Sequence, residues 1–69
     1  MVNSIQAFVI LCYPKVGAAE PFIFKQGFLG YDNAEKFLED AGYRVSYKDG
    51  VRTLYEDSMD YVEIMEVFL

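Results

Sequence analysis

Residues 32–42 read DNAEKFLEDAG, and this stretch decides the fold because it contains the one clear helical pattern of the chain. Asp32 stands three residues before Glu35, which is the spacing of a capping box, so Asp32 is expected to be the N-cap. Gly42 supplies the left-handed residue with which many helices end. One buried stripe at the i, i+3, i+4 and i+7 positions completes the pattern: Ala34, Phe37, Leu38 and Ala41.

The segments before this helix favour two strands. Ile5–Tyr13 is continuously apolar, which predicts a central strand covered on both faces. A second strand is expected at Phe22–Lys25, pairing back as a hairpin across the loop Pro14–Pro21. Gly27 and Gly30 are expected to mark the exit from it.

A hairpin is predicted after the helix, with its turn at Asp49-Gly50. A two-residue loop would place Tyr47 opposite Arg52. A three-residue loop with a left-handed Gly50 gathers the apolar residues on one face, because a one-residue slip would scatter them. We therefore expect the three-residue loop, with these pairs: Tyr47 with Val51, Val45 with Thr53 and Tyr43 with Tyr55.

The last segment, residues 60–69, fits two structures. As a helix it would place Asp60, Glu63 and Glu66 on one side, whereas as a strand it would place one Glu on each face. Its β-branched and aromatic residues favour a strand, and an edge position would tolerate the charges. Residues 1–69 are thus expected to form a single α+β domain: a small antiparallel sheet with one helix on a face, ordered ββαβββ, or ββαββα if the last element is helical.

Length and composition limit how this domain can be stabilised. A chain of 69 residues buries only about 60% of the surface that its unfolded form exposes, so its stability is marginal without further support. Cys12 is its only cysteine, so no disulfide can form within it. Twelve aromatic residues supply an apolar core. Self-association is the remaining means of stabilisation, and a homo-oligomer and a monomer are given equal weight.

The start of the chain favours a cytoplasmic protein. Met1–Gln6 has no charged side chain, which argues against a signal peptide, and the apolar run is too short to span a bilayer. Cys12 is then expected to be a small buried hydrophobe in a reducing compartment.

The net charge of −5 is concentrated in the second half of the chain. Ten of the eleven acidic residues follow Tyr31, together with only four basic ones. Such a charge disfavours direct binding of nucleic acid or an anionic membrane and favours a partner protein with a basic surface. Tyr31 and Tyr61 are the expected aromatic anchors. The expected acidic face comprises Glu35, Glu39, Asp40, Glu56, Asp57, Asp60, Glu63 and Glu66.

The sequence contains no motif that carries a chemistry. It has no histidine, so the commonest general base and metal ligand is missing, and the lone Cys12 has no partner base. Gly27-Phe28-Leu29-Gly30 lacks the Lys-Ser/Thr of a phosphate loop and is interpreted as a pair of turn glycines. No catalytic residue, metal or cofactor is expected, and the protein is predicted to be non-enzymatic.

The leading prediction is therefore a small acidic binding protein that presents its acidic face to a basic partner. One alternative is an oligomer that sequesters a small ligand or nucleotide signal, with tyrosines stacking on a base and Arg44, Lys48 or Arg52 holding its phosphate. The other is an accessory subunit of a larger assembly. Acidity that serves only to keep the chain in solution remains a further interpretation.

The layout also resembles that of small uncharacterised proteins of bacterial viruses and mobile elements. The resemblance covers about half of the chain and rests on a capped helix, a tight hairpin and a closing strand. It implies no role for any single residue. It implies that the partner is a host factor, such as a defence nuclease or a nucleic-acid-binding protein, which the protein inhibits or modulates. The residues that carry it are Gly27-Phe28, Tyr31, Ala34, Phe37-Leu38, Ala41-Gly42-Tyr43, Asp49-Gly50 and Tyr61-Val62-Glu63-Ile64.

Overall fold

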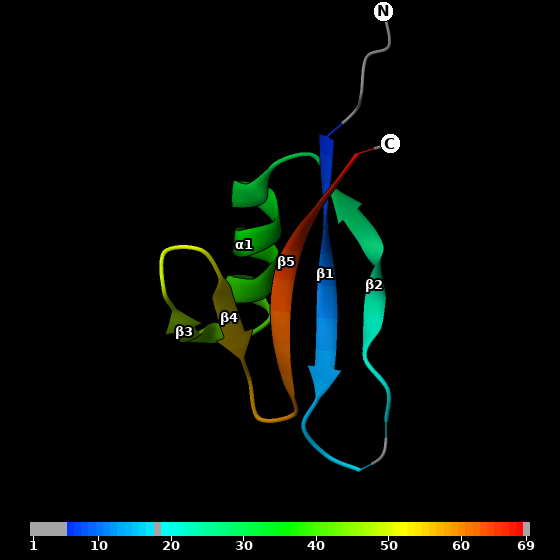
Figure 1. The fold of residues 1–69 in the computed structure, drawn as a ribbon, viewed down its shortest axis with the longest axis vertical. Coiled ribbons are helices and arrows are strands. Elements are labelled where there is room, and N and C mark those ends of the chain that lie inside the picture. The colour runs from blue at the N-terminus through cyan, green and yellow to red at the C-terminus, as the bar shows by residue number, and fades with distance from the viewer. Residues whose placement is uncertain (1–5, 18, 69) are drawn as a thin grey trace, which may run out of the picture.

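The protein is an α+β domain in which one helix packs on a five-stranded antiparallel sheet (Figure 1). The computed structural model describes residues 6–17 and 19–68. The strand order is β2-β1-β5-β4-β3, and the chain order ββαβββ is the predicted one. The elements are β1 (Gln6–Pro14), β2 (Phe22–Phe28), α1 (Tyr31–Asp40), β3 (Arg44–Lys48), β4 (Thr53–Glu56) and β5 (Asp60–Phe68).

The centre of the sheet joins two strands from distant parts of the sequence. β1 and β5 pair over nine residues, from Gln6 opposite Phe68 to Pro14 opposite Asp60. The central place of β1 and the strand form of residues 60–68 are confirmed. The edge position expected for β5 is wrong, because β5 lies between β1 and β4. Its charge at Glu63 is tolerated there because Arg52 forms an ion pair with it.

The hairpin of β1 and β2 is confirmed, but β2 is longer than predicted. It runs on to Phe28, so Gly27 lies inside the strand, opposite Val9, and does not mark its exit. The pairing is irregular: it moves from Gly27 to Ile23 while β1 advances only from Val9 to Leu11. Such a bulge increases the local twist of the edge strand.

The predicted helix forms, but Asp32 is not its N-cap. Gly30 holds that place in an extended conformation, separated from the end of β2 only by Leu29, and its carbonyl oxygen accepts the amide of Ala34 at 3.2 Å. Asp32 therefore lies within the first turn. The helix stops at Asp40, which leaves Ala41 exposed instead of in the buried stripe.

The end of the helix follows the prediction. Gly42 has φ +93°, and its amide donates to the carbonyl of Glu39 at 3.0 Å. The amide of Tyr43 donates to the carbonyl of Leu38 at 2.9 Å, which makes the pair of bonds of a Schellman motif. The motif turns the chain so that Tyr43 enters the core beside Leu38.

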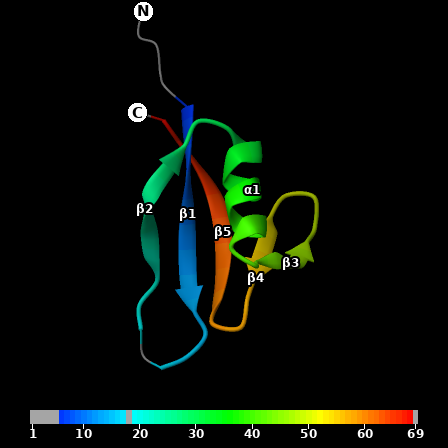
Figure 2. The same cartoon turned by 180° about the vertical axis from the view of Figure 1, so that it is seen from behind.

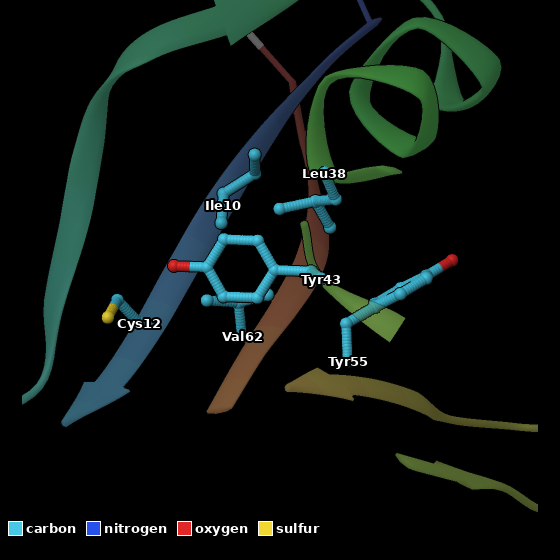
Figure 3. Packing of buried hydrophobic residues seen from close by; sticks show 6 residues of the cluster. All are labelled: Ile10, Cys12, Leu38, Tyr43, Tyr55 and Val62. Carbon is cyan, nitrogen blue, oxygen red and sulfur yellow. The ribbon is translucent and has the colours of Figure 1, made fainter. Parts of the chain in front are cut away.

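The core lies between α1 and one face of the sheet. Figure 3 shows the Tyr43 side chain among residues of both central strands and the helix. Phe37 packs on its margin against Phe24 and Phe28, with ring centroids 6.3 and 5.2 Å apart. The buried cluster is formed by Ile10, Cys12, Leu38, Tyr43, Tyr55 and Val62.

Alternation along the strands gives the sheet a covered face and an open face. Ile10 and Cys12 point toward α1 and are fully buried, whereas Val9 and Leu11 point the other way and are half-buried. Figures 1 and 2, seen from opposite sides, show α1 on one side of the strands only. Among residues 6–17 and 19–68, no helix or strand packs on the second face, so the expectation that Ile5–Tyr13 is covered on both faces is wrong for the described part of that strand. The open face consists of Ala7, Val9, Leu11, Tyr13, Ile23, Gly27, Arg44, Tyr47, Leu54, Glu56, Tyr61, Glu63, Met65 and Val67.

The register expected for the second hairpin is wrong. Lys48 pairs with Thr53 and Tyr47 with Leu54, so four residues form the loop, and a further irregularity falls between Val45 and Tyr47. The left-handed Gly50 is confirmed at φ +88°. The extra loop length follows from Asp49, whose carboxylate accepts the backbone amides of Val51 at 2.9 Å and Arg52 at 2.8 Å.

Candidate functional site

The outer surface of α1 carries the largest group of acidic residues that form no ion pair in the described part of the chain. Glu39 and Asp40 are exposed in its last turn, and Asp32 is exposed in its first. Glu35 is half-buried because it accepts a hydrogen bond at 2.8 Å from the Tyr55 hydroxyl. We call Asp32, Glu35, Glu39 and Asp40 the acidic helix surface.

Two of the predicted partner-binding acids are neutralised on the open face. Glu56 lies 2.5 Å from the Lys15 ammonium, and Glu63 lies 2.6 Å from the Arg52 guanidinium. The hydrogen bond from Lys15 lowers the pKa of Glu56. Tyr13 also donates to Glu63, at 3.3 Å. These carboxylates already have partners inside the protein.

The acids of the β4–β5 turn hold the backbone. The Asp57 carboxylate accepts the amides of Met59 and Asp60, both at 2.8 Å. Asp60 accepts the Tyr43 hydroxyl at 3.4 Å. Both residues therefore shape the turn and fix a core tyrosine.

Glu66 lies apart from the other acids. The strand register puts it opposite Phe8, on the face that α1 covers, where Gln6 donates a hydrogen bond to it. Glu63 and Glu66 point to opposite faces, as alternation along a strand requires. The eight acids of the predicted face thus do not share one surface.

The two expected aromatic anchors are partly used within the domain. The Tyr31 ring packs edge-on against Phe8, with centroids 5.9 Å apart, and its hydroxyl lies 3.4 Å from that of Tyr55. The Lys15 ammonium lies 4.6 Å above the Tyr61 ring on the open face. About two-fifths of each tyrosine remains exposed, 38% for Tyr31 and 39% for Tyr61, so each still offers surface to a partner.

The three basic residues of the ligand-binding alternative do not converge. Arg52 is paired with Glu63, Arg44 lies opposite Glu56, and Lys48 lies opposite Thr53. A polar hollow of about 570 Å³ lies between the end of α1 and the β4–β5 turn, and of these three residues only Arg44 lines it. Lys15 lines it as well, but Glu56 and Asp57 do too, so the hollow offers a phosphate no net positive charge.

Groups that could carry a chemistry are few in the described residues. No group of three potential metal ligands occurs there. Cys12 is buried, and this burial raises the pKa of its thiol to about 11, so the thiol stays protonated at neutral pH. No helix in the described part of the chain is long and apolar enough to cross a membrane.

Comparison of the chain with protein-family models, with curated proteins and with solved structures found no match. The surfaces described above are therefore the basis for the function.

Sequence reasoning missed two features of these surfaces. It treated Asp32 as a cap, although the residue adds a carboxylate to the helix surface. It also missed the open face, because a strand that is apolar at every position predicts two covered faces. The available signal was the count of helices, since one short helix can cover only one face of a sheet.

Proposed function

We propose that this protein is a non-enzymatic binding protein that docks the acidic helix surface onto a basic surface of a partner, which it inhibits or modulates. The main support for this proposal is the end of α1, where Glu39 and Asp40 are exposed and the last turn holds no basic residue. The carboxyl end of a helix is the negative end of its dipole, so acidic groups there are unfavourable. A basic group from a partner would offset the unfavourable interaction of both carboxylates with the negative end of the helix.

The rest of the helix supports the same partner chemistry. Its surface carries four carboxylates against the single ammonium of Lys36. Opposite charge speeds encounter and decides the choice of partner more than it adds affinity. The exposed part of Tyr31, at the first residue of α1, would supply apolar contact. The partner class that fits is a host protein with a basic surface, including those that use such a surface to hold nucleic acid.

Affinity capture from a host lysate at two salt concentrations tests this proposal. The wild-type protein should retain a basic protein at low salt and lose most of it at high salt, because screening shortens the range of exposed charges. The double variant Glu39→Gln/Asp40→Asn should lose the retained protein at low salt as well.

The matched control is Glu20→Lys, which changes the net charge by the same amount as the double variant but in the β1–β2 loop. It should retain the partner as the wild type does. Capture that ignores salt would contradict the proposal. So would equal reduction of capture by the double variant and the control, since total charge and not the helix surface would then be responsible.

A further inference from the structure

The open face presents a continuous apolar area across the middle of the sheet. Val9 lies opposite Met65 on the two central strands, and Ala7 lies opposite Val67. Apart from the buried Ala7, these residues are only half-buried. An apolar area of this kind, rimmed by polar groups, is typical of an interaction site.

Flanking strands widen this area. Ile23 of β2 lies opposite Leu11 and is 52% exposed. Leu54 of β4 lies opposite Glu63 and is half-buried. The apolar surface therefore extends over β2, β1 and β5, and the ion pair of Glu63 with Arg52 lies between it and Leu54 on β4.

The charge of the open face differs from that of the chain as a whole. Its two acids, Glu56 and Glu63, are both paired within the same molecule, with Lys15 and Arg52. Arg44 lies opposite Glu56 and adds a third basic group. The charge near this face is thus about balanced although the chain carries −5. Two copies of the face can approach without the repulsion that two acidic surfaces would meet.

The edges of the sheet are less suited to association than its face. β2 and β3 are the edge strands, and each has an irregularity in its pairing. Exposed Lys25 lies in β2, and exposed Lys48 ends β3. Bulges and lysines on edge strands are devices that prevent edge-to-edge pairing.

We propose that the open face binds a second copy of this chain, face to face, in a two-fold dimer of packed sheets. Two sheets that pack in this way keep their strands within about 30° of each other and interdigitate the side chains of the inner faces. The two acidic helix surfaces then lie on the outside of the dimer, as far apart as the fold allows. This arrangement rests on the open face alone and holds whatever the helix surface binds.

The size of the face sets the expected strength. At about 3.4 Å per residue and about 4.8 Å per strand, the open face of β2, β1, β5 and β4 covers on the order of 550 Å², polar groups included. A standard protein interface takes about 800 Å² from each partner, so this one is small. We therefore expect a reversible dimer that forms in the micromolar range, and not an obligate one.

Sedimentation over a concentration range tests the dimer. The wild-type mass should rise from monomer to dimer between about 5 and about 500 micromolar. Met65→Lys buries an unpaired charge in the middle of the interface and should weaken association at least about tenfold. Ile23→Lys should act in the same direction. Because Ile23 is already 52% exposed in the monomer, its variant should fold normally and keeps the test valid if Met65→Lys does not fold.

Val51→Lys is the control, since Val51 lies in the β3–β4 loop and is 96% exposed. It should dimerise as the wild type does. A wild type that stays monomeric throughout this range, or a dimer that Ile23→Lys leaves intact, would overturn the proposal. Masses beyond the dimer that disappear with Glu39→Lys would also overturn it, because they would show the open face of one copy binding the acidic helix surface of the next.

Discussion

The covered and open faces of the sheet are built from the same strands, yet they are buried to very different extents. Ile10 and Cys12 lie under α1 and expose none of their surface, whereas Val9 and Leu11, their neighbours in sequence, stay half-buried. A helix of ten residues is about 15 Å long, about half the length of the two nine-residue central strands. The apolar composition of a strand thus shows how much surface it could bury. How much it does bury depends on whether a helix or another sheet is available to cover each of its faces.

The largest expected effect compares two isomeric side chains at adjacent positions. Ile10→Ala should lower the free energy of unfolding by about 2–5 kcal/mol, because it leaves a cavity in the core. Leu11→Ala should cost about 1 kcal/mol or less in dilute solution, since water already reaches that side chain. Urea unfolding at low protein concentration measures both. Equal losses would show that the open face is as well packed as the covered one.

Alkaline titration probes the covered face alone. Burial raises the pKa of the Cys12 thiol from 9.0 to about 11 and that of the Tyr43 hydroxyl from 10.0 to about 12. Both groups are kept protonated by folding, so stability is fully present below pH 9 and lost as the pH rises toward 12. The loss should reach about 2 kcal/mol at pH 10.

Urea midpoints between pH 7 and pH 11 would measure this loss. In Cys12→Ala the early part of the loss should disappear. The part due to Tyr43 and Tyr55, whose hydroxyl pKa burial also raises, should remain above pH 10. A wild-type midpoint that stays constant to pH 11 would show that the covered face admits water as the open face does.

The smallest effect concerns the outer surface of α1, the helix that covers one face of the sheet and leaves the other face open. Asp40→Lys replaces an acid by a base at the negative end of α1 and should stabilise the protein by about 0.5 kcal/mol. Glu20→Lys makes the same change of charge in the β1–β2 loop and serves as the control. If both variants gain equally, relief of the net charge and not the helix end would be the cause.

Much of the fold could be predicted from local pattern. The 3.6-residue stripe located the helix, and Gly42 located its end, because these signals depend on residues close together in the sequence. The strand order could not be predicted in this way. The central position of β5 depends on its pairing with β1, and Gln6 and Glu66, which meet there, are 60 residues apart.

The geometry of the β3–β4 turn was predicted wrongly for a different reason. The hairpin prediction used Gly50 and alternation but not the Asp49 carboxylate, whose two bonds to the backbone extend the loop to four residues. The same kind of bond from Asp57 forms the β4–β5 turn, so an Asp that begins a turn is a signal that sequence reasoning could use.

The candidate surface was predictable on the helix and unpredictable on the sheet. Glu39 and Asp40 could be placed outside because the helical stripe fixes the opposite side. The pairing of Glu63 with Arg52 depends on the register of β4 against β5, and a shift of one residue would turn that carboxylate to the other face.

Because β1 pairs with β5, the sheet cannot be completed during synthesis until β5 has been made. The β1–β2 hairpin is complete long before the ribosome reaches β5, which lies at the other end of the described chain. Until then residues 7–13, with neither a charge nor a proline, have no partner on one edge. Such a segment is the kind that pairs with other chains and aggregates. We therefore expect nascent chains to need protection until residue 68 has emerged, and a chain cut before β5 to aggregate where the whole one folds.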